Sequence, residues 1–416
     1  MRVEALSGWT TEQKHVVAAS FLGWTLDAFD FFLMVFVLKD IAAEFETDVT
    51  KVTIAILLTL AMRPIGAFLF GRAADRWGRR PTLMVDVLFY SAIEFASGFA
   101  PSLTALLVLR AVYGIAMGGE WGVGASLTME SIPPHARGFV SGLLQSGYPF
   151  GYFLASIVYG LFFQYIGWRG MFMVGVLPAL LVLYIRRTVP ESPSWKPSTS
   201  RNSNTWTLLK SHWRLGIYAV LLMTAFNFFS HGTQDLYPTF LQVQHGFSPH
   251  EVGLIAVIYN IGAIIGGISF GSLSERFGRR RMIITASVLS LVVLPLWAFA
   301  ATAVWLAVGA FLMQVMVQGA WGVVPVHLNE LSPDEARGTF PGFTYQLGNL
   351  IASVNATLQA AIAMHYGNNY AIGLAVVAGV IAVVIAILTA LGTEAKGIVF
   401  GTGVNPDGAV KPLPSS

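Results

Sequence analysis

The stretch GRAADRWGRR at residues 71–80 returns as GSLSERFGRR at residues 271–280. The same spacing of 200 residues joins Gly119, Trp121, Gly122, Glu130, Arg137, Gly138 and Gly142 to Gly319, Trp321, Gly322, Glu330, Arg337, Gly338 and Gly342. A register kept over so many positions predicts that the chain is a tandem duplication of one structural unit.

The composition places this duplicated unit in a membrane. Of 416 residues, 55% are hydrophobic and 11% are charged, whereas soluble domains carry about 25% charged residues. So few charges cannot cover a soluble protein of this size, and a mean hydropathy of +0.64 agrees. Disordered chains, secreted disulfide scaffolds and nucleic-acid binders are excluded. Because the chain has no cysteine, thiol nucleophiles and thiolate metal sites are excluded too.

Apolar runs separated by Pro, Gly and charged residues predict membrane spans of about 20 residues each. The twelve predicted spans are 15–38, 53–71, 81–100, 103–127, 138–166, 170–188, 214–241, 251–274, 282–301, 303–326, 339–365 and 370–392. They predict an all-α membrane protein with twelve transmembrane helices in two pseudo-symmetric six-helix bundles. The bundles are residues 1–188 and 214–392, with a cytoplasmic linker at 189–213 and a disordered cytoplasmic tail at 393–416.

The distribution of Lys and Arg predicts the orientation of these spans. With both termini in the cytoplasm, 20 of the 25 basic residues lie on the cytoplasmic side, as the positive-inside rule requires. The first apolar run contains two aspartates, so we expect no cleavable signal peptide. The expected location is the plasma membrane, as a multi-pass protein of a bacterial inner membrane.

Three motifs resemble the major facilitator superfamily. They are the G-x-x-x-D-R-x-G-R-R loop after the second span, the Arg110, Gly114 and Gly118 series in the fourth, and PESP at residues 190–193 after the sixth. The resemblance implies a two-lobed secondary transporter with a site at mid-membrane and alternating access by rocking of the halves. No nucleophile–base pair, phosphate-binding loop or metal-ligand pattern indicates an enzyme.

The two repeated loops lie where spans meet the cytoplasm. Their repeated acid and glycines favour a charge-relay gate, because a topology anchor would need only arginine. The predicted cytoplasmic gate residues are Asp75, Arg79, Arg80, Glu275, Arg279 and Arg280. A plain anchor is the alternative, and their place at the membrane edge makes them unsuited as substrate ligands.

Ionisable residues inside membrane spans are expensive and therefore indicate function. The predicted spans contain Asp27, Asp30, Arg63, Asp86, Glu94, Arg110, Glu120, His231 and Asp235. The repeat replaces Asp27, Asp30 and Glu120 by Asn227, Ser230 and Ala320, and this asymmetry favours a role at a single substrate or proton site. We expect Asp86 and Glu94 to make helix–helix contacts and Arg110 to be structural.

The seventh span contains a polar stretch, NFFSHGTQDLYPT, at residues 227–239. Asn227, His231 and Gln234 share one helical stripe, which must face a cavity or another helix because lipid cannot satisfy it. A lone histidine can also be a packing residue. The string resembles the sialate:proton symporter family and, within it, the fungal lactate permeases. That resemblance implies transport of lactate or pyruvate with a proton.

A carboxylate at mid-membrane needs a fixed cation and hydrogen-bond donors. Arg63 offers two parallel donors, and Asn227, His231 and Gln234 can add more. Arg63 could instead be the structural partner of an acid on the first or seventh span.

Acids in a dry site can exchange a proton near neutral pH. The proton-coupling candidates are Asp27, Asp30, Glu120 and Asp235, with His231 as a further possibility. LDAFDF at residues 26–31 also resembles the first span of bacterial sialate permeases. Helix packing could instead keep one of these acids permanently protonated.

The sequence therefore predicts proton-coupled symport of small monocarboxylates. It predicts no metal and no cofactor besides the coupling proton, and the expected partners are a small organic-acid anion, the proton and the lipid bilayer. We expect a monomer that binds no nucleic acid. The alternatives are a proton symporter of sialate or another larger organic acid, and a non-transporting membrane sensor. A sensor would usually append a soluble signalling domain.

Overall fold

The computed structural model describes residues 8–195 and 211–400, and within these ranges the secondary structure is helical throughout. The first half contains α1 (Thr11–Phe36), α2 (Leu38–Glu44), α3 (Val49–Trp77), α4 (Arg79–Ser97), α5 (Leu103–Ser131), η2 (Pro134–Ala136), α6 (Arg137–Gln145), α7 (Gly147–Val174) and α8 (Ala179–Thr188). The second half contains α11 (Trp213–Gln234), α12 (Tyr237–His245), α13 (Pro249–Phe277), α14 (Arg279–Phe299), α15 (Ala303–Leu331), η3 (Asp334–Ala336), α16 (Phe340–Ala352), α17 (Asn355–His365) and α18 (Tyr370–Leu391). The predicted all-α architecture of two matching halves is confirmed.

Ten helical stretches of the described chain are long and apolar enough to cross a membrane. α4 is not among them; it spans 19 residues and begins with two arginines. The predicted span 170–188 is interrupted, because residues 175–178 form a turn between α7 and the ten-residue α8. Gly167, with φ of +61°, ends the preceding straight part of α7.

Helix ends follow local chemistry. Thr10 caps α1 in a reciprocal pair with Gln13, which satisfies amides that have no partner in the first turn. Gly78 and Gly278 separate α3 from α4 and α13 from α14, with φ of +109° and +99°. This backbone conformation favours glycine, so the repeated loops of both halves make the same turn.

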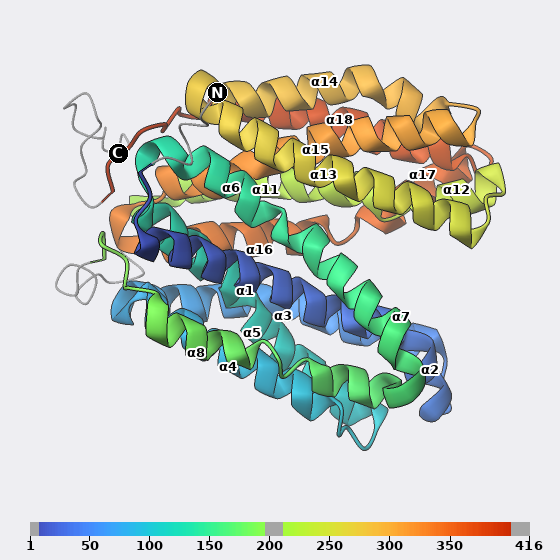
Figure 1. Cartoon of the computed structure of the whole chain (residues 1–416). Coiled ribbons are helices and arrows are strands. Elements are labelled where there is room, and N and C mark those ends of the chain that lie inside the picture. Colours follow the sequence, from blue (N-terminus) through green and yellow to red (C-terminus); the bar gives the residue numbers. More distant parts are fainter. Residues whose placement is uncertain (1–7, 196–210, 401–416) are drawn as a thin grey trace.

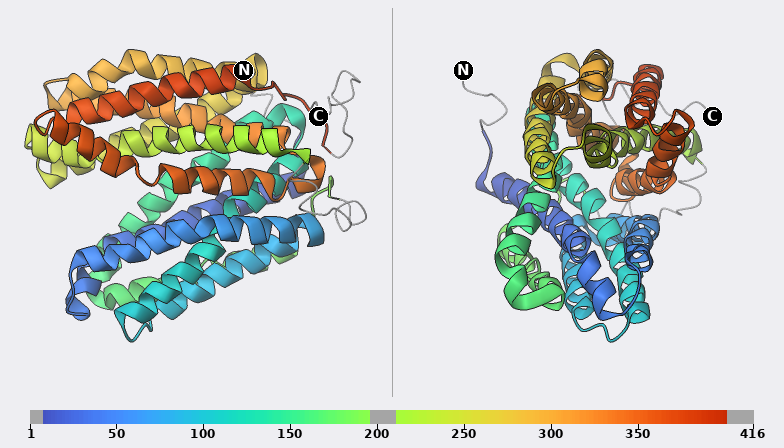
Figure 2. Two further views of the ribbon diagram at one scale, coloured as in Figure 1. Left: turned by 180° about the vertical axis from the view of Figure 1, so that it is seen from behind. Right: turned by 90° about the vertical axis from the view of Figure 1, so that its right-hand side faces the viewer.

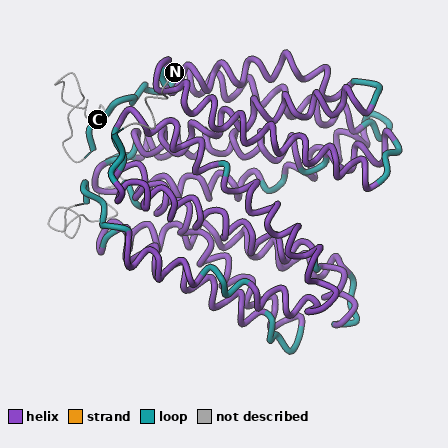
Figure 3. Tube along the Cα trace, viewed as in Figure 1, coloured by secondary structure: helices purple, strands orange, loops and turns teal. Residues whose placement is uncertain are grey.

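Both ends of the described chain lie at one end of the molecule, here named the terminal face (Figure 1). Figure 2 shows the two halves as separate bundles from behind and from the side. They pack together through α6 on α13 and α16 on α3. Toward the opposite end, here named the distal face, the two bundles diverge (Figure 3). The described structure is therefore closed at the terminal face.

Glycine backbones make the closest contacts between the halves. A Cβ atom on Gly142 would lie 2.1 Å from the carbonyl oxygen of Gly267. A Cβ atom on Gly122 would lie 2.7 Å from the Cα atom of Gly342. No side chain fits in either place, so the small residues allow the backbones to meet directly.

Residues 393–400 continue from α18 as an ordered segment, so the prediction of a disordered tail is wrong for them. The side chains of Ala395, Ile398 and Phe400 are buried. The Glu394 carboxylate accepts hydrogen bonds from the backbone amides of Arg279 and Arg280 at 3.3 and 3.0 Å. The remainder of the predicted tail, and most of the predicted linker, lie outside the described residues.

Arg110 is buried in the first half and pairs with an acid on a neighbouring helix. Its Nη2 atom lies 2.5 Å from Glu94 Oε2 and 2.8 Å from Ser97 Oγ. These contacts between α5 and α4 confirm the predicted structural role of Arg110 and the predicted helix–helix contact of Glu94. For Asp86 no such bond is seen: its carboxylate has no hydrogen-bond partner in the described chain, although Glu120 and Asp27 of neighbouring helices lie within electrostatic reach.

Replacing Glu94 by leucine should destabilise the protein strongly, because Arg110 would keep a buried charge without its partner. Loss of one partner of a buried pair costs about 3–5 kcal/mol, so the melting temperature in detergent should fall by several degrees. Glu44→Gln is the matched control. It breaks the pair of Glu44 with Arg169, whose side chains are 45% and 34% exposed and which contributes at most about 1 kcal/mol. Equal melting temperatures for both variants would contradict this account.

Candidate substrate site between the two halves

Arg63 lies at the midpoint of α3 and is 4% exposed. Its Nε and Nη2 atoms have no hydrogen-bond partner within the described residues. Asp27 of α1 and Glu120 of α5 are close enough for direct Coulomb interaction with it. Arg63 therefore has acidic neighbours, as expected for a structural partner of an acid, and also unused N–H donors, as expected for a substrate ligand.

His231 and Asp235 of the second half lie one turn apart at the end of α11. His231 Nδ1 lies 3.2 Å from Asp235 Oδ1, and His231 Nε2 lies 3.1 Å from Asn349 Oδ1. Oxygen atoms thus face both ring nitrogens, and a protonated imidazole, which donates from both, satisfies this arrangement. The two side chains are 35% and 39% exposed, and His231 interacts electrostatically with Arg63 across the interface.

Aromatic residues from both halves surround this interface. The ring of Tyr345 in α16 lies between Trp121 and Trp321, at centroid distances of 4.7 and 5.5 Å. These tryptophans are repeat equivalents from opposite halves. Tyr148 of α7 is within electrostatic reach of Arg63, Tyr345 and Asp235. Arg63 and His231 thus lie near each other at an interface that carries aromatic rings from both halves.

Two members of the predicted stripe on α11 contact other helices of the second half. Asn227 is buried, and its amide donates to the carbonyl oxygens of Met223 at 2.8 Å and Tyr345 at 3.5 Å. The Gln234 amide donates to Gln314 Oε1 of α15 at 2.9 Å. Both residues hold α11 in place, whereas His231 of the same stripe interacts electrostatically with Arg63.

The predicted coupling acids Asp27, Asp30 and Glu120 are fully buried inside the first half. None of their carboxylate oxygens has a hydrogen-bond partner among the described residues. Glu120 lies against α1, since a Cβ atom on Gly23 would be 2.3 Å from Glu120 Oε1. Asp235 differs, because it is partly exposed and paired with His231.

The buried charges of the first half do not balance. Away from the terminal face, its helices bury five acids and two arginines, namely Asp27, Asp30, Asp86, Glu94, Glu120, Arg63 and Arg110. Isolated buried charges are strongly unfavourable, so this excess of acids marks the first half as the place where a proton or another cation would be accommodated.

The predicted gate acids connect the two halves at the terminal face. Asp75 accepts hydrogen bonds from the backbone amides of Gly338 at 2.7 Å and Thr339 at 3.0 Å. Glu275 accepts one from the amide of Gly138 at 2.5 Å. Each acid thus lies at the N-terminal end of a helix of the other half, where negative charge is favoured.

Arginines orient these acids in matching ways. Arg79 lies 3.2 Å from Asp75 and 3.0 Å from Glu130, and Arg279 lies 2.8 Å from Glu275 and 3.0 Å from Glu330. Arg80 and Arg280 have a different role. They donate to backbone carbonyls at the ends of α8 and α18, so these contacts stay within their own halves.

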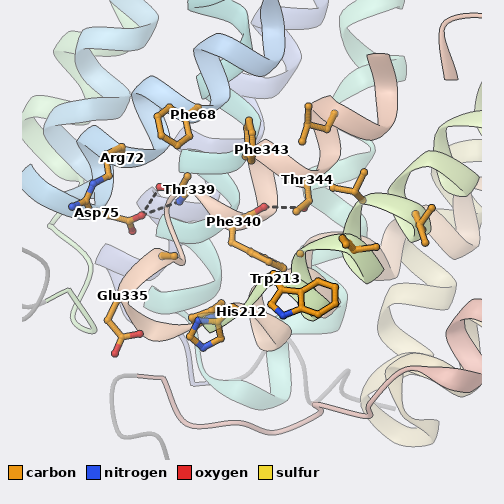
Figure 4. Close-up of a pocket in the computed structure, with 17 residues that line it drawn as sticks. Phe68, Arg72, Asp75, His212, Trp213, Glu335, Thr339, Phe340, Phe343 and Thr344 are labelled. Atoms are coloured by element: carbon orange, nitrogen blue, oxygen red, sulfur yellow. Dashed lines mark hydrogen bonds between the residues drawn. The ribbon is translucent and has the colours of Figure 1, made fainter. Parts of the chain in front are cut away.

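A separate cavity of about 390 Å³ lies beside the gate, between α3, α11 and α16 (Figure 4). Its lining is largely apolar and includes Phe68, Trp213 and Phe343, with Asp75 bonded to Thr339 at one wall. Neither Arg63 nor His231 lines it, so we do not assign the substrate to this cavity.

Sequence reasoning missed Gln346. It is 1% exposed, and neither amide atom has a hydrogen-bond partner in the described chain. Gly342, one turn earlier on α16, lies against Ala67, which is one turn after Arg63 on α3. Gln346 and Arg63 are therefore at the same level of the interface. The sequence feature that could have identified it is the pair of amide side chains, Gln346 and Asn349, three residues apart in an apolar span.

Comparison with known proteins agrees with this architecture. A sequence model described as Major Facilitator Superfamily matches residues 20–248 and 220–405. A carboxylic acid transporter protein homolog of Saccharomyces cerevisiae is 29% identical over 374 residues, which are 83% of this chain and 61% of that protein. The chain thus spans less than two thirds of the yeast relative. The sialic acid transporter NanX of Escherichia coli is 28% identical over 359 residues, covering 85% of this chain and 88% of that protein.

A solved structure has the same fold. The proton:xylose symporter XylE, bound to 6-bromo-6-deoxy-D-glucose, superposes with a TM-score of 0.78 over 94% of this chain and 98% of that chain. Its sequence is 18% identical, so the likeness concerns the fold alone.

Proposed function

This chain belongs to the Major Facilitator Superfamily, and from that premise we propose that it carries small monocarboxylates such as lactate or pyruvate together with protons. Its relatives and structural neighbours are transporters and not enzymes. The observation that supports the proposal most directly is Arg63, buried at mid-span with two unpaired guanidinium nitrogens. A carboxylate, with two acceptor oxygens, is the best match for the planar pair of N–H donors of a guanidinium group. The yeast relative is named for carboxylic acid transport.

Coupling follows from the neighbours of Arg63. In the empty site, the arginine charge interacts with Asp27 and Glu120 and favours their ionised forms. A bound substrate anion offsets that charge, so proton uptake by either acid becomes easier. The carrier that holds both substrate and proton then reorients without an unpaired buried charge. With substrate but no proton, the site keeps an unpaired buried charge, and this charge opposes reorientation. The amide nitrogen of Asn349, whose oxygen faces His231, can donate to a hydroxyl or keto oxygen of the substrate.

The terminal face is the cytoplasmic face in this proposal, since most Lys and Arg residues lie there. Both termini are then cytoplasmic, in a bacterial inner membrane, and the protein acts as a monomer. The described structure, closed at the terminal face and divergent at the distal face, is then the outward-facing state. Asp75 and Glu275 hold it by binding helix ends of the opposite half.

The purified protein in proteoliposomes should take up labelled lactate when an inward proton gradient is imposed, and a protonophore should abolish this uptake. His231→Asn should reduce the initial rate at least tenfold, because it removes the ring nitrogen that faces Asp235 and the charge beside it. His135→Asn, at an exposed position of η2, is the matched control and should transport normally. Gradient-independent uptake would refute proton coupling, and normal uptake by His231→Asn would refute its place in the site.

The E. coli relative favours a second candidate substrate class, sialate or another larger organic acid. Unlabelled sialate and pyruvate should therefore be compared as competitors of labelled lactate. Competition by pyruvate alone supports the small-monocarboxylate proposal. Efficient competition by sialate, with weak lactate uptake, would favour the alternative.

A further inference from the structure

The segment after α18, residues 393–400 (here named the C-terminal strap), runs along the terminal face of the molecule. It is anchored to the second half through Glu394, which accepts from the Arg279 and Arg280 amides. The first half has an equivalent anchor, in which Glu191 accepts from the amides of Arg79 and Arg80 at 2.9 and 3.2 Å. The strap therefore begins as one member of a symmetric pair.

Beyond this anchor the strap contacts the other half of the molecule. The carbonyl oxygen of Ile398 accepts a hydrogen bond from Arg137 Nη1 at 2.8 Å. Arg137 begins α6 of the first half and is 4% exposed. A segment covalently attached to the second half thus supplies a buried acceptor to an arginine of the first.

The ring of Phe400 extends this contact. It lies 3.7 Å from the guanidinium carbon of Arg137 and 4.1 Å from that of Arg337. These arginines are repeat equivalents from opposite halves, and their like charges repel each other. An aromatic ring attracts a cation on each face. Because Phe400 is 7% exposed, water screens these attractions poorly.

These contacts require a closed terminal face. If the halves rock apart there, Arg137 moves with the first half while the Glu394 anchor and Arg337 stay with the second. The Ile398 hydrogen bond and one cation–π contact are then lost together. We propose that the C-terminal strap is a conformational latch, in which Phe400 and Ile398 hold Arg137 to the second half and stabilise the state closed at the terminal face.

The latch can be tested without substrate, so its failure and the failure of the proposed function are distinguishable. Since the chain has no cysteine, spin labels can be attached to cysteines at the exposed positions His135 and Glu335. These positions lie in η2 and η3, on opposite halves at the terminal face. Pulsed electron spin resonance then measures the closed and open populations of the full chain in lipid nanodiscs.

Phe400→Ala should shift the closed-to-open ratio toward the open state by roughly tenfold, since it removes the poorly screened cation–π contact with Arg137, which exists only in the closed state. Phe400→Leu keeps an apolar side chain without a π face and should shift it in the same direction, whereas Phe400→Trp should stay closed. Phe277→Ala is the matched control, because Phe277 contacts Arg276 of its own helix at 5.4 Å and should leave the ratio unchanged.

Unchanged populations in Phe400→Leu, which is the milder variant if Phe400→Ala fails to fold, would overturn the latch. An equal shift in Phe277→Ala would also overturn it, because the effect would then not depend on a contact between the halves.

Discussion

Replacing Arg63 by alanine should lower uptake of labelled lactate at subsaturating concentration by at least about a hundredfold. The side chain offers two buried donors without partners, and each hydrogen bond between charged groups contributes about 1.5–3 kcal/mol. Loss of both therefore exceeds two factors of ten, at about 1.4 kcal/mol for each factor. Arg63→Lys keeps the charge but not the planar pair of donors, so its loss should be intermediate. Initial rates in proteoliposomes at several lactate concentrations measure both variants.

The matched control is Arg76→Ala, on the same helix but exposed at the terminal face. It should retain uptake, and gel filtration of each variant verifies that the protein is folded. Uptake by Arg63→Ala at the wild-type rate would show that the substrate carboxylate binds elsewhere. If Arg63→Lys were as active as the wild type, charge alone would suffice and the two-pronged geometry would have no role.

Replacing Gly142 by leucine should prevent closure of the terminal face. The first added carbon would lie 2.1 Å from the Gly267 carbonyl oxygen and 2.9 Å from the Ile268 Cα atom, and both belong to the opposite half. The backbone of α13 cannot give way by that much, so the halves must separate. We expect nearly all molecules to be open at the terminal face and transport to fall more than tenfold. Spin labels at His135 and Glu335 report the opening.

Gly160→Leu is the matched control, because nothing lies within 4 Å of the Cβ position at Gly160. It adds the same side chain to the neighbouring helix of the same half without touching the other half. A closed distance distribution in Gly142→Leu, with normal transport, would mean that the described contact between α6 and α13 is not part of the cycle.

The sequence repeat was sufficient to predict the duplicated architecture and the matching positions of Asp75 and Glu275, whose role as a gate stays a prediction. Both depend on residues that are close together in the sequence: the glycines Gly78 and Gly278, which adopt a positive φ, and an acid near two arginines. The partners of Asp75 were not predictable, because they are backbone amides of Gly338 and Thr339 and backbone atoms carry no sequence signature. The broken span at 170–188 was missed because hydropathy averages over Gly175 and Pro178, although both residues indicate a turn.

The arrangement of side chains around Arg63 was predictable only in part. The position of Arg63 in a span was sufficient to single it out, since a buried charge needs a reason. Helical periodicity placed Asn227, His231 and Gln234 on one stripe of α11, but it could not predict which neighbouring helix each side chain would contact. Tyr345 and Gln314 take up the two amides, and this outcome depends on α16 and α15 rather than on α11.

The glycine contacts at the terminal face have a kinetic consequence. Where Gly122 meets Gly342 and Gly142 meets Gly267, the halves present smooth backbone surfaces to each other. Interlocked side chains would have to change rotamer before the halves could slide or tilt, and each such change would add to the activation barrier. Smooth surfaces leave that barrier to a few charged and aromatic contacts. The turnover rate can then be tuned at single residues without rebuilding the interface.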